Sequence, residues 1–336
     1  MKRNREGLDI EQLRGWSSAI ANDPAARVAM NAVTQTSIDE VALDRGRLLN
    51  VQTSMSHRLD NWEAADQKRS GRCWLFAALN LLRSDARKKM NVKDFEFSQN
   101  HAMYWDKIER ANYFLEDMID LADMASDSRV TMWLLANVVD DGGQWDMEVA
   151  VFEKYGVVPK ALMPETESSS NTSRMNESLR TRLRKGARQL REAVASGQGP
   201  TAVAALKQVI LRDTHRILTI HLGVPPQNFE WRWNDDDNEF HDAGQFTPQT
   251  FLAKFTDIAL GDYVCLIDDP RSEHPKGRSY TVAHLGNVVG GNPVLYLNTD
   301  THTMKRLAAE TIVAGEPVWF GCDVDPHMER TRGVWS

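Results

Sequence analysis

The residues best suited to chemistry lie in one segment, Gln67-Lys-Arg-Ser-Gly-Arg-Cys-Trp-Leu-Phe-Ala-Ala-Leu-Asn-Leu-Leu82. The run Trp74–Leu82 is almost wholly apolar, which predicts a buried helix that begins at Cys73. A thiol at the positive end of a helix favours the thiolate, the nucleophile of acyl transfer. We therefore interpret Cys73 as a candidate nucleophile. The alternative is a small buried hydrophobic residue, which is a common role of free cysteine.

Two further residues of this segment suit the same chemistry. Gln67 carries an amide N–H that, together with the backbone N–H of Cys73, would stabilise an oxyanion. Gly71 has no Cβ, so another chain can pass close to the sulfur. The glutamine, the glycine and the apolar helix together favour a catalytic cysteine with Gln67 as its oxyanion donor.

The pattern Gln-x-x-x-Gly-x-Cys-Trp resembles the nucleophile segment of papain-like cysteine peptidases. The closer resemblance is to the family of bleomycin hydrolase and aminopeptidase C. Further segments carry that resemblance in family order: Phe95–Gln99, Trp105–Glu109, Asp141–Asp146, Glu153–Pro159, Met163–Ser170, Leu285–Gly291 and Pro317–Cys322. The resemblance implies a peptidase that removes residues from the amino end of short peptides, and we expect no cofactor. Members of the family assemble as hexamers, and we expect at most partial self-association of this chain.

The order of patterns along the chain predicts an α+β protein. We expect an N-terminal helical extension over residues 1–60, a helical lobe with the nucleophile helix over 61–165, a helical insertion over 166–224 and a β-rich part over 225–336. The resemblance implies a papain-like fold in which the β-rich lobe carries the catalytic histidine and asparagine. The family segments Thr-His-Ala-Met and Glu-Asn-Ser-Trp-Gly are absent from the sequence. We therefore expect an incomplete β-rich lobe.

A glycine pair is the candidate substrate-binding wall. The segment Asp141-Gly-Gly-Gln-Trp145 resembles the glycine pair along which papain-like enzymes lay the substrate backbone. We interpret Gly142 and Gly143, with Trp74, as substrate-binding residues, since glycines let an extended peptide approach the chain closely. An ordinary turn before a helix is the alternative.

The general base is left unassigned by the sequence. His215 and His221 fall in an amphipathic helical pattern, and His101 falls in a helix after the nucleophile helix, so none of the three suits a base at the start of a strand. His284 lies on an expected strand with Asn287 nearby, and it is kept as a candidate. The other histidines have loop-like contexts and no evident partner: His57, His241, His274, His302 and His327.

Composition limits the other functional classes. The chain has 336 residues, a formal net charge of -7 and three cysteines, which indicates a protein of a reducing compartment, and we expect a cytoplasmic location. It has no run long enough to span a bilayer, and neither Cys-x-x-Cys nor His-Glu-x-x-His spacing for a metal.

The basic pattern over 180–191 favours a solvated or subunit-facing helix over nucleic acid binding. The alternative to an enzyme is a family remnant that binds peptides or subunits without catalysis.

Overall fold

The computed structural model describes residues 7–59, 63–322, 328–329 and 331–335, and the chain divides into two compact units. The larger unit is His57–Phe320, and the smaller one combines residues 1–56 with 321–336. Within the described ranges, no helix is long and apolar enough to cross a membrane.

The smaller unit is helical at its N-terminal end. Its elements are α1 (Ile10–Asn22), α2 (Pro24–Val33), α3 (Ile38–Val41), α4 (Arg45–Leu49) and the antiparallel pair of β6 (Met328–Glu329) and β7 (Val334–Trp335). The dipeptide Asp23-Pro24 is typical of a helix start, and it begins α2: the Asp23 carboxylate accepts a hydrogen bond from the Ala25 N–H, and Pro24 occupies the first turn.

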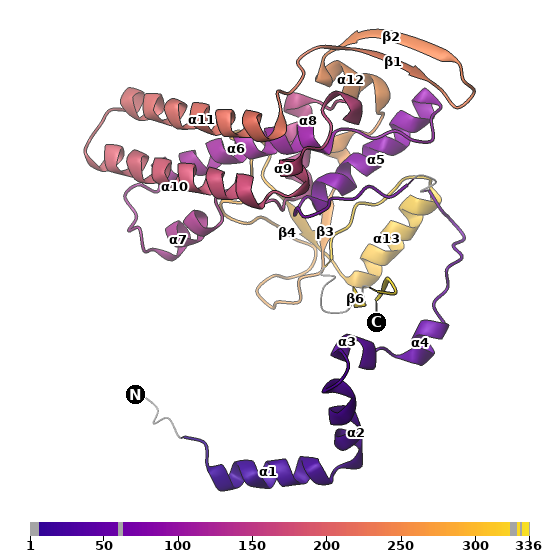
Figure 1. The fold of residues 1–336 in the computed structure, drawn as a ribbon. Coiled ribbons are helices and arrows are strands. Elements are labelled where there is room, and N and C mark those ends of the chain that lie inside the picture. Colours follow the sequence, from indigo (N-terminus) through magenta and orange to yellow (C-terminus); the bar gives the residue numbers. More distant parts are fainter. Residues whose placement is uncertain (1–6, 60–62, 323–327, 330, 336) are drawn as a thin grey trace. The chain divides into compact units, whose positions relative to one another are not determined.

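The larger unit places helices around a core to which several short strands are added (Figure 1). Its helices are α5 (Cys73–Met90), α6 (Gln99–Asp120), α7 (Arg129–Ala136), α8 (Trp145–Tyr155), α9 (Glu167–Ser170), α10 (Ser173–Ala195), α11 (Pro200–Leu222), α12 (Pro248–Phe255) and α13 (Thr301–Val313), with 3-10 turns η1 (Lys160–Leu162) and η2 (Leu260–Asp262). Its strands are β1 (Phe229–Asn234), β2 (Phe240–Phe246), β3 (Cys265–Ile267), β4 (Ser279–Tyr280) and β5 (Tyr296–Asn298).

A capping serine marks the start of α6, and a glycine marks the end of α8. Ser98 caps α6, because its hydroxyl accepts a hydrogen bond from the His101 N–H at 3.0 Å. Helix α8 ends at Gly156, which has a φ of +64° and whose Cβ, if present, would lie 2.2 Å from the Pro248 carbonyl carbon. Both the backbone conformation and this close approach require glycine there.

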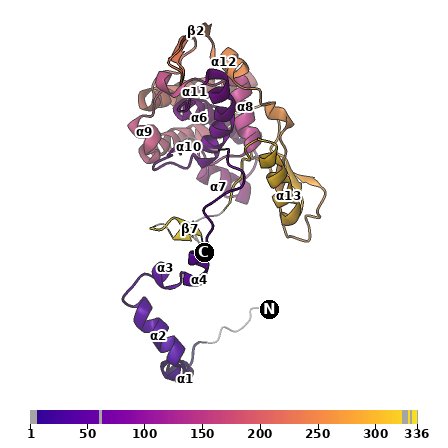
Figure 2. The same cartoon turned by 90° about the vertical axis from the view of Figure 1, so that its right-hand side faces the viewer.

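The predicted helical insertion is a pair of antiparallel helices. Helices α10 and α11 lie side by side, and both contact α6 (Figure 1). Gly186 permits the close approach, since a Cβ on it would lie 2.8 Å from the Ile210 side chain. Figure 2 shows this pair and α13 on opposite sides of the larger unit.

The basic face of α10 contacts the ends of other helices. The Arg191 guanidinium donates to the Leu121 carbonyl at 2.6 Å and to the Met124 carbonyl, both just beyond α6. Arg184 donates to the Leu135 carbonyl of α7 at 2.7 Å. Because helix C-termini expose unpaired carbonyls, these arginines attach the α10–α11 pair to the rest of the unit.

The strands form two separate small sheets in the larger unit. β1 and β2 make an antiparallel hairpin with an irregularity at Trp231/Arg232, and β5 lies between β3, which is parallel to it, and β4, which is antiparallel. The sequence pattern predicts a loop over residues 165–173 and strands over 279–283 and 318–320, and these three local predictions were wrong. The stretch Glu165–Ser173 contains α9, stabilised by a capping box, and residues 318–320 form no strand. Of the strand expected over 279–283, only Ser279–Tyr280 is paired.

Replacing Arg191 tests whether it attaches the α10–α11 pair to the rest of the larger unit. The variant Arg191→Ala should lower the free energy of unfolding by about 1–2 kcal/mol, because two helix-end carbonyls lose a charged donor. Arg188→Ala is the matched control on the same helix, since Arg188 makes only an exposed ion pair with Glu192, and we expect a loss below about 0.5 kcal/mol. Urea unfolding of both variants measures the difference, and equal losses would contradict the attachment role.

Candidate active site

Cys73 is the first residue of α5 and its side chain is exposed, whereas the residues that follow are buried. Trp74, Leu75 and Phe76 retain 5%, 1% and 6% of their surface, as the apolar pattern predicted. The N-cap residue Arg72 provides no side-chain hydrogen bond to the first turn. The N–H groups and the positive end of the helix dipole are therefore available beside the Cys73 sulfur.

A pocket of about 400 Å³ opens beside the thiol. Its lining includes the proposed substrate residues Trp74, Gly142 and Gly143 together with Cys73. Gly143 lies against the indole, because a Cβ on it would be 2.7 Å from the Trp74 ring. The structure thus brings the candidate nucleophile Cys73 and the glycine wall together, while Gln67 lies outside the lining of this pocket.

The Asp141 carboxylate joins three parts of the chain at this point. One oxygen accepts from the Gly71 N–H at 3.3 Å and from the Thr172 hydroxyl at 2.5 Å. The other accepts from Asn176 at 2.8 Å and from the Lys107 ammonium at 2.7 Å. The nucleophile loop, the glycine wall, α6 and α10 therefore share one anion.

Lys107 supplies the positive charge of this cluster. Its ammonium is 1% exposed and donates to the Val139 and Asp140 carbonyls, each at 2.9 Å, as well as to Asp141. All three of its donors are thus satisfied. Burial alone would raise the pKa of Asp141, but the Lys107 charge and the hydrogen bonds outweigh burial and hold that pKa below its usual range. Burial lowers the pKa of Lys107 against the attraction of Asp141.

A second ion pair holds the glycine wall from the side of α6. The Arg110 guanidinium binds both oxygens of Asp106, at 2.9 and 2.7 Å, and donates to the Gly142 carbonyl at 2.7 Å. The guanidinium also lies 5.4 Å from the centroid of the Trp74 ring. The Asp141 carbonyl accepts from the Trp74 indole N–H at 2.6 Å. The two consecutive carbonyls at the start of the wall are therefore bound by Trp74 and Arg110.

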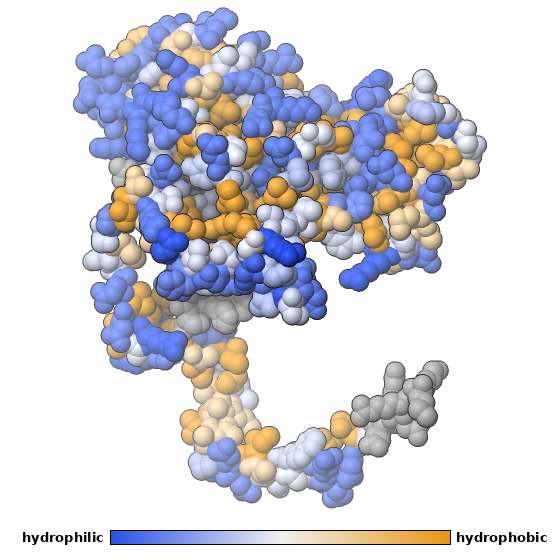
Figure 3. All heavy atoms as spheres, turned by 180° about the vertical axis from the view of Figure 1, so that it is seen from behind, coloured by the Kyte–Doolittle hydropathy of each residue, from blue (hydrophilic) through white to orange (hydrophobic). Residues whose placement is uncertain are grey.

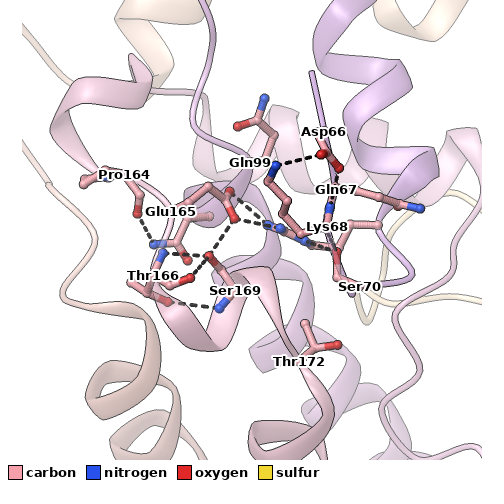
Figure 4. Close-up of polar contacts among 12 residues, drawn as sticks. Asp66, Gln67, Lys68, Ser70, Gln99, Pro164, Glu165, Thr166, Ser169 and Thr172 are labelled. Atoms are coloured by element: carbon pink, nitrogen blue, oxygen red, sulfur yellow. Dashed lines mark hydrogen bonds and ion pairs between the residues drawn. The ribbon is translucent and has the colours of Figure 1, made fainter. Parts of the chain in front are cut away.

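The loop before the cysteine is fixed by a third ion pair. Arg72 is 1% exposed and makes two hydrogen bonds with the Glu165 carboxylate, at 3.0 and 2.7 Å. Its Nε donates to the Ser70 hydroxyl, which in turn donates to the Gln67 carbonyl at 2.7 Å. Figure 4 shows this network around Glu165 and Ser169, with the Gln67 side chain pointing away from Glu165. The Gln67 Oε1 atom is buried and, among the described residues, without a hydrogen bond.

Comparisons with known proteins agree with this geometry. The model of the Peptidase C1-like family matches residues 7–336. The chain belongs to this family. It is 40% identical over 327 residues to aminopeptidase C of Listeria innocua, a match that covers 97% of this chain and 74% of that protein. It is 37% identical to bleomycin hydrolase of Gallus gallus, with 98% and 74% covered.

A solved structure shows the same fold. It is described as PepW from Lactobacillus rhamnosis, and it superimposes with a TM-score of 0.94 at 42% identity, covering 96% of this chain and 73% of that one. The papain-like α+β fold predicted from the sequence is thereby confirmed. The family membership likewise confirms the resemblance on which the site prediction depended.

Three histidines that the sequence placed on helices are found there, and one of them is buried in the core. His215 and His221 lie on α11, as expected. His101 is 1% exposed and accepts from the Trp105 indole N–H, and burial lowers its pKa to about 3. His101 is therefore a neutral core residue. In the part of the chain that the structure describes, no cluster of three or more His, Cys, Asp or Glu could hold a metal ion.

His284 lines the same pocket as Cys73, but its surroundings differ from those expected. It is not in a paired strand, and its φ is +58°. Its Nδ1 lies 2.9 Å from Asp117 Oδ1 of α6. Asn287, the partner suggested by proximity in sequence, instead donates to Asp106 and to the Met147 carbonyl, each at 2.9 Å. Across residues 63–322, no hydrogen bond joins the Cys73 sulfur to an imidazole.

Several site residues were missed by the sequence analysis. Lys107 and Asp106 lie in the segment Trp105–Glu109, and Asp141 precedes the glycine pair, so the motif showed their positions without their roles. The signal for this buried ion pair is a lysine on a mostly apolar helix face, followed later in the chain by an acidic turn. Asp117 carries no comparable signal, because its partner is 167 residues away.

Replacing Asp141 tests its role in stability. The variant Asp141→Asn should lower the free energy of unfolding by about 3–5 kcal/mol at pH 7, because a buried Lys107 loses its counter-charge. Asp140→Asn is the matched control; Asp140 is exposed, and we expect a change below about 0.5 kcal/mol. Urea unfolding measures both.

The difference in unfolding free energy between wild type and Asp141→Asn should depend on pH. The pKa of Asp141 is lower in the folded chain than in the unfolded chain, where it is about 3.9, so its stabilisation is complete above that value and is lost as the pH falls further. The stability gap between wild type and Asp141→Asn should therefore be constant between about pH 5 and pH 7 and narrow below about pH 4. A gap that widened in acid would contradict this assignment.

Proposed function

We propose that the protein is a cysteine-type aminopeptidase that cleaves short peptides through the Cys73 thiolate. The observation that carries the proposal is the exposed thiol at an uncapped helix N-terminus, in one pocket with Gly142 and Gly143. The relatives named aminopeptidase C and bleomycin hydrolase support the same activity.

The chemistry follows from the roles of these groups. The thiolate attacks the carbonyl carbon of the scissile bond, so that an S–C bond forms and the carbonyl oxygen becomes an oxyanion. The Cys73 N–H and the Gln67 amide would stabilise that oxyanion. The C–N bond then breaks, the leaving amine takes a proton, and water hydrolyses the thioester. Gly142 and Gly143 would hold the substrate backbone along the pocket wall.

The reaction also needs a group that takes the proton from the thiol and delivers one to the leaving amine. His284 is the candidate, since it lines the pocket and Asp117 orients its Nδ1, as a base requires. If His284 is the base, His284→Ala should lower kcat by about 10²–10⁴-fold while leaving KM little changed.

The competing proposal is a binding module without catalysis. It is favoured by the absence, across residues 63–322, of a hydrogen bond between the Cys73 sulfur and an imidazole. A peptidase assay on the purified chain separates the two proposals. Turnover that is abolished by Cys73→Ala excludes the binding module, and lack of turnover in wild type excludes the enzyme.

We also propose that the protein is cytoplasmic and self-associates, as the family resemblance implies. Apolar side chains are exposed along α1 and beyond it (Figure 3), including Ile10, Trp16 and Ile20, which are 62%, 51% and 58% exposed. Exposed apolar faces of this kind commonly mark subunit contacts. Analytical ultracentrifugation tests the proposal, and a monomer at all accessible concentrations would exclude it.

Selective alkylation tests the activated thiol. Near pH 7, iodoacetamide should modify Cys73 at least about tenfold faster than Cys265 or Cys322. Burial raises the pKa of Cys265 to about 11, which keeps that thiol protonated, and Cys322 is an exposed thiol on no helix. Mass spectrometry of each cysteine peptide gives the three rates. A Cys73 rate no greater than that of Cys322 would refute activation.

Removing the Gln67 amide tests the oxyanion role. Gln67→Ala should lower kcat by about 10²–10³-fold and leave the rate of Cys73 alkylation unchanged, because the amide acts on the carbonyl oxygen and not on the thiol. The control is Lys68→Ala, since the Lys68 side chain is exposed and pairs only with Asp66. Equal activity of the two variants would argue against the role of Gln67.

A further inference from the structure

The helix that follows the glycine wall carries a fully buried acid. Glu148 lies in the first turn of α8 and is 0% exposed. Both of its carboxyl oxygens are buried and, within the described chain, neither makes a hydrogen bond. An ionised carboxylate would be strongly unfavourable there, because no donor replaces the water that it has lost. The surroundings therefore favour a neutral carboxylic acid at this position.

A second buried carboxylate shares the surroundings of Glu148. Asp106 of α6 is 1% exposed and binds the Arg110 guanidinium with both oxygens, at 2.9 and 2.7 Å. The Asn287 amide donates to Asp106 and to the carbonyl of Met147, which precedes Glu148 in the chain. Burial first, and then the charge of Asp106, raise the pKa of Glu148 well above its usual range, while Arg110 opposes that rise. Two acids thus share one guanidinium.

This ion pair of α6 supplies the charges that act on Glu148. Helices α5 and α12 also contact α8, but among the described residues only the ion pair of α6 shifts the pKa of Glu148 by its charge. Asp146, the other acid in the first turn of α8, accepts a hydrogen bond from a backbone N–H. The nearby imidazole of His284 is paired with Asp117. An ionised Glu148 would therefore have one cation within reach, and that cation is already in use.

The shared guanidinium is also a support of the glycine wall. Arg110 donates to the Gly142 carbonyl at 2.7 Å, and its guanidinium lies 5.4 Å from the centroid of the Trp74 ring. A guanidinium binds a carboxylate more strongly than a neutral carbonyl, because the acceptor carries a full charge. A second carboxylate near Arg110 would therefore compete first with the Gly142 carbonyl. The charge of Glu148 is in this way connected to the wall beside Cys73.

We propose that Glu148 is a positioning residue that stays a neutral carboxylic acid and so leaves the Arg110 guanidinium to Asp106 and the Gly142 carbonyl. When Glu148 loses its proton, the new carboxylate competes with that carbonyl for Arg110, and the wall loosens in alkaline solution. Glu148 is not part of the pocket lining, so it acts through Arg110 and takes no part in bond making. The proposal rests on the proposed function in treating the glycine wall as the site of the peptide backbone.

Unfolding as a function of pH tests the neutral acid. The folded chain keeps the Glu148 proton to a higher pH than the unfolded chain, where the pKa is about 4.3, so wild type loses stability as the pH rises above that value. Glu148→Gln and Glu148→Leu cannot ionise. From pH 5 to pH 9, the folded-to-unfolded ratio of each variant relative to wild type should therefore grow at least about tenfold in urea unfolding. Glu153→Gln, which replaces an exposed carboxylate of α8, is the control and should show no such growth. Parallel curves for wild type and both Glu148 variants overturn the proposal.

Two thiol probes test the effect on the wall without requiring turnover. Acetyl-norleucyl-glycine chloromethyl ketone is an uncharged probe with a peptide backbone, whereas iodoacetamide has no backbone to lie along the wall. Both need the Cys73 thiolate, so the ratio of their second-order rates, measured by mass spectrometry, is independent of the ionisation of the thiol. In wild type this ratio should fall about fivefold or more from pH 6 to pH 9, because the wall loses its support. The ratio should stay constant in Glu148→Gln and fall as in wild type in Glu153→Gln.

The outcomes separate this inference from the proposed function. If the peptide probe modifies Cys73 selectively but the ratio is constant in wild type, or falls equally in Glu148→Gln, the positioning role is overturned and the proposed function stands. If the peptide probe modifies Cys73 no faster than Cys322 at any pH, the proposed function fails and the positioning role fails with it. A fall in the ratio that occurs in wild type and is absent from Glu148→Gln supports the role of Glu148.

Discussion

The buried Asp141 carboxylate is the constraint on which the site depends. Transfer of a charge from water into the interior is unfavourable unless opposite charge and hydrogen bonds replace the solvent. Asp141 meets that requirement through Lys107, Thr172, Asn176 and the backbone of Gly71. These partners come from three parts of the chain, namely α6, the start of α10 and the loop before Cys73, so the carboxylate is stable only when those parts are assembled. The cluster therefore couples folding of the helices to formation of the site.

This coupling gives the site its rigidity. A nucleophile and a substrate wall are useful only if their separation is held within a narrow range. Cys73 follows Arg72, which is fixed by Glu165, and the glycine wall follows Asp141 and is fixed again by Arg110. Three buried ion pairs thus hold two loops, and neither loop relies on its own short-range structure. The helical insertion contributes through Asn176 and belongs to the site as well as to the periphery.

The part of the pocket lining that includes His284 is held by different means. The segment from His284 to Asn287 has little regular hydrogen bonding of its own, and it is fixed by contacts with α6. Asn287 donates to the same Asp106 carboxylate that binds Arg110. One carboxylate therefore relates the glycine wall to the wall that carries His284. The position of His284 in the pocket follows from this arrangement.

The sequence alone determined the features that depend on neighbouring residues. The apolar run after Cys73 specified a buried helix that begins at Cys73, because burial and the helix N-terminus are local consequences of pattern. The order of helical and strand-like segments, with the family motifs, predicted the α+β fold. Short strands and the capped turn α9 were misjudged, since pairing partners and caps decide such elements more than propensity does.

Only the tertiary structure decided which distant charges meet. Asp141 and Lys107 are 34 residues apart, and Asp117 and His284 are 167 apart, so no period or spacing relates them. Nor did the sequence show that His101 is buried and neutral. Histidine occurs on both the buried and the exposed face of helices, so its residue type alone does not decide between them. Charge pairing and burial are properties of the assembled core, where the loss of water makes each partner necessary.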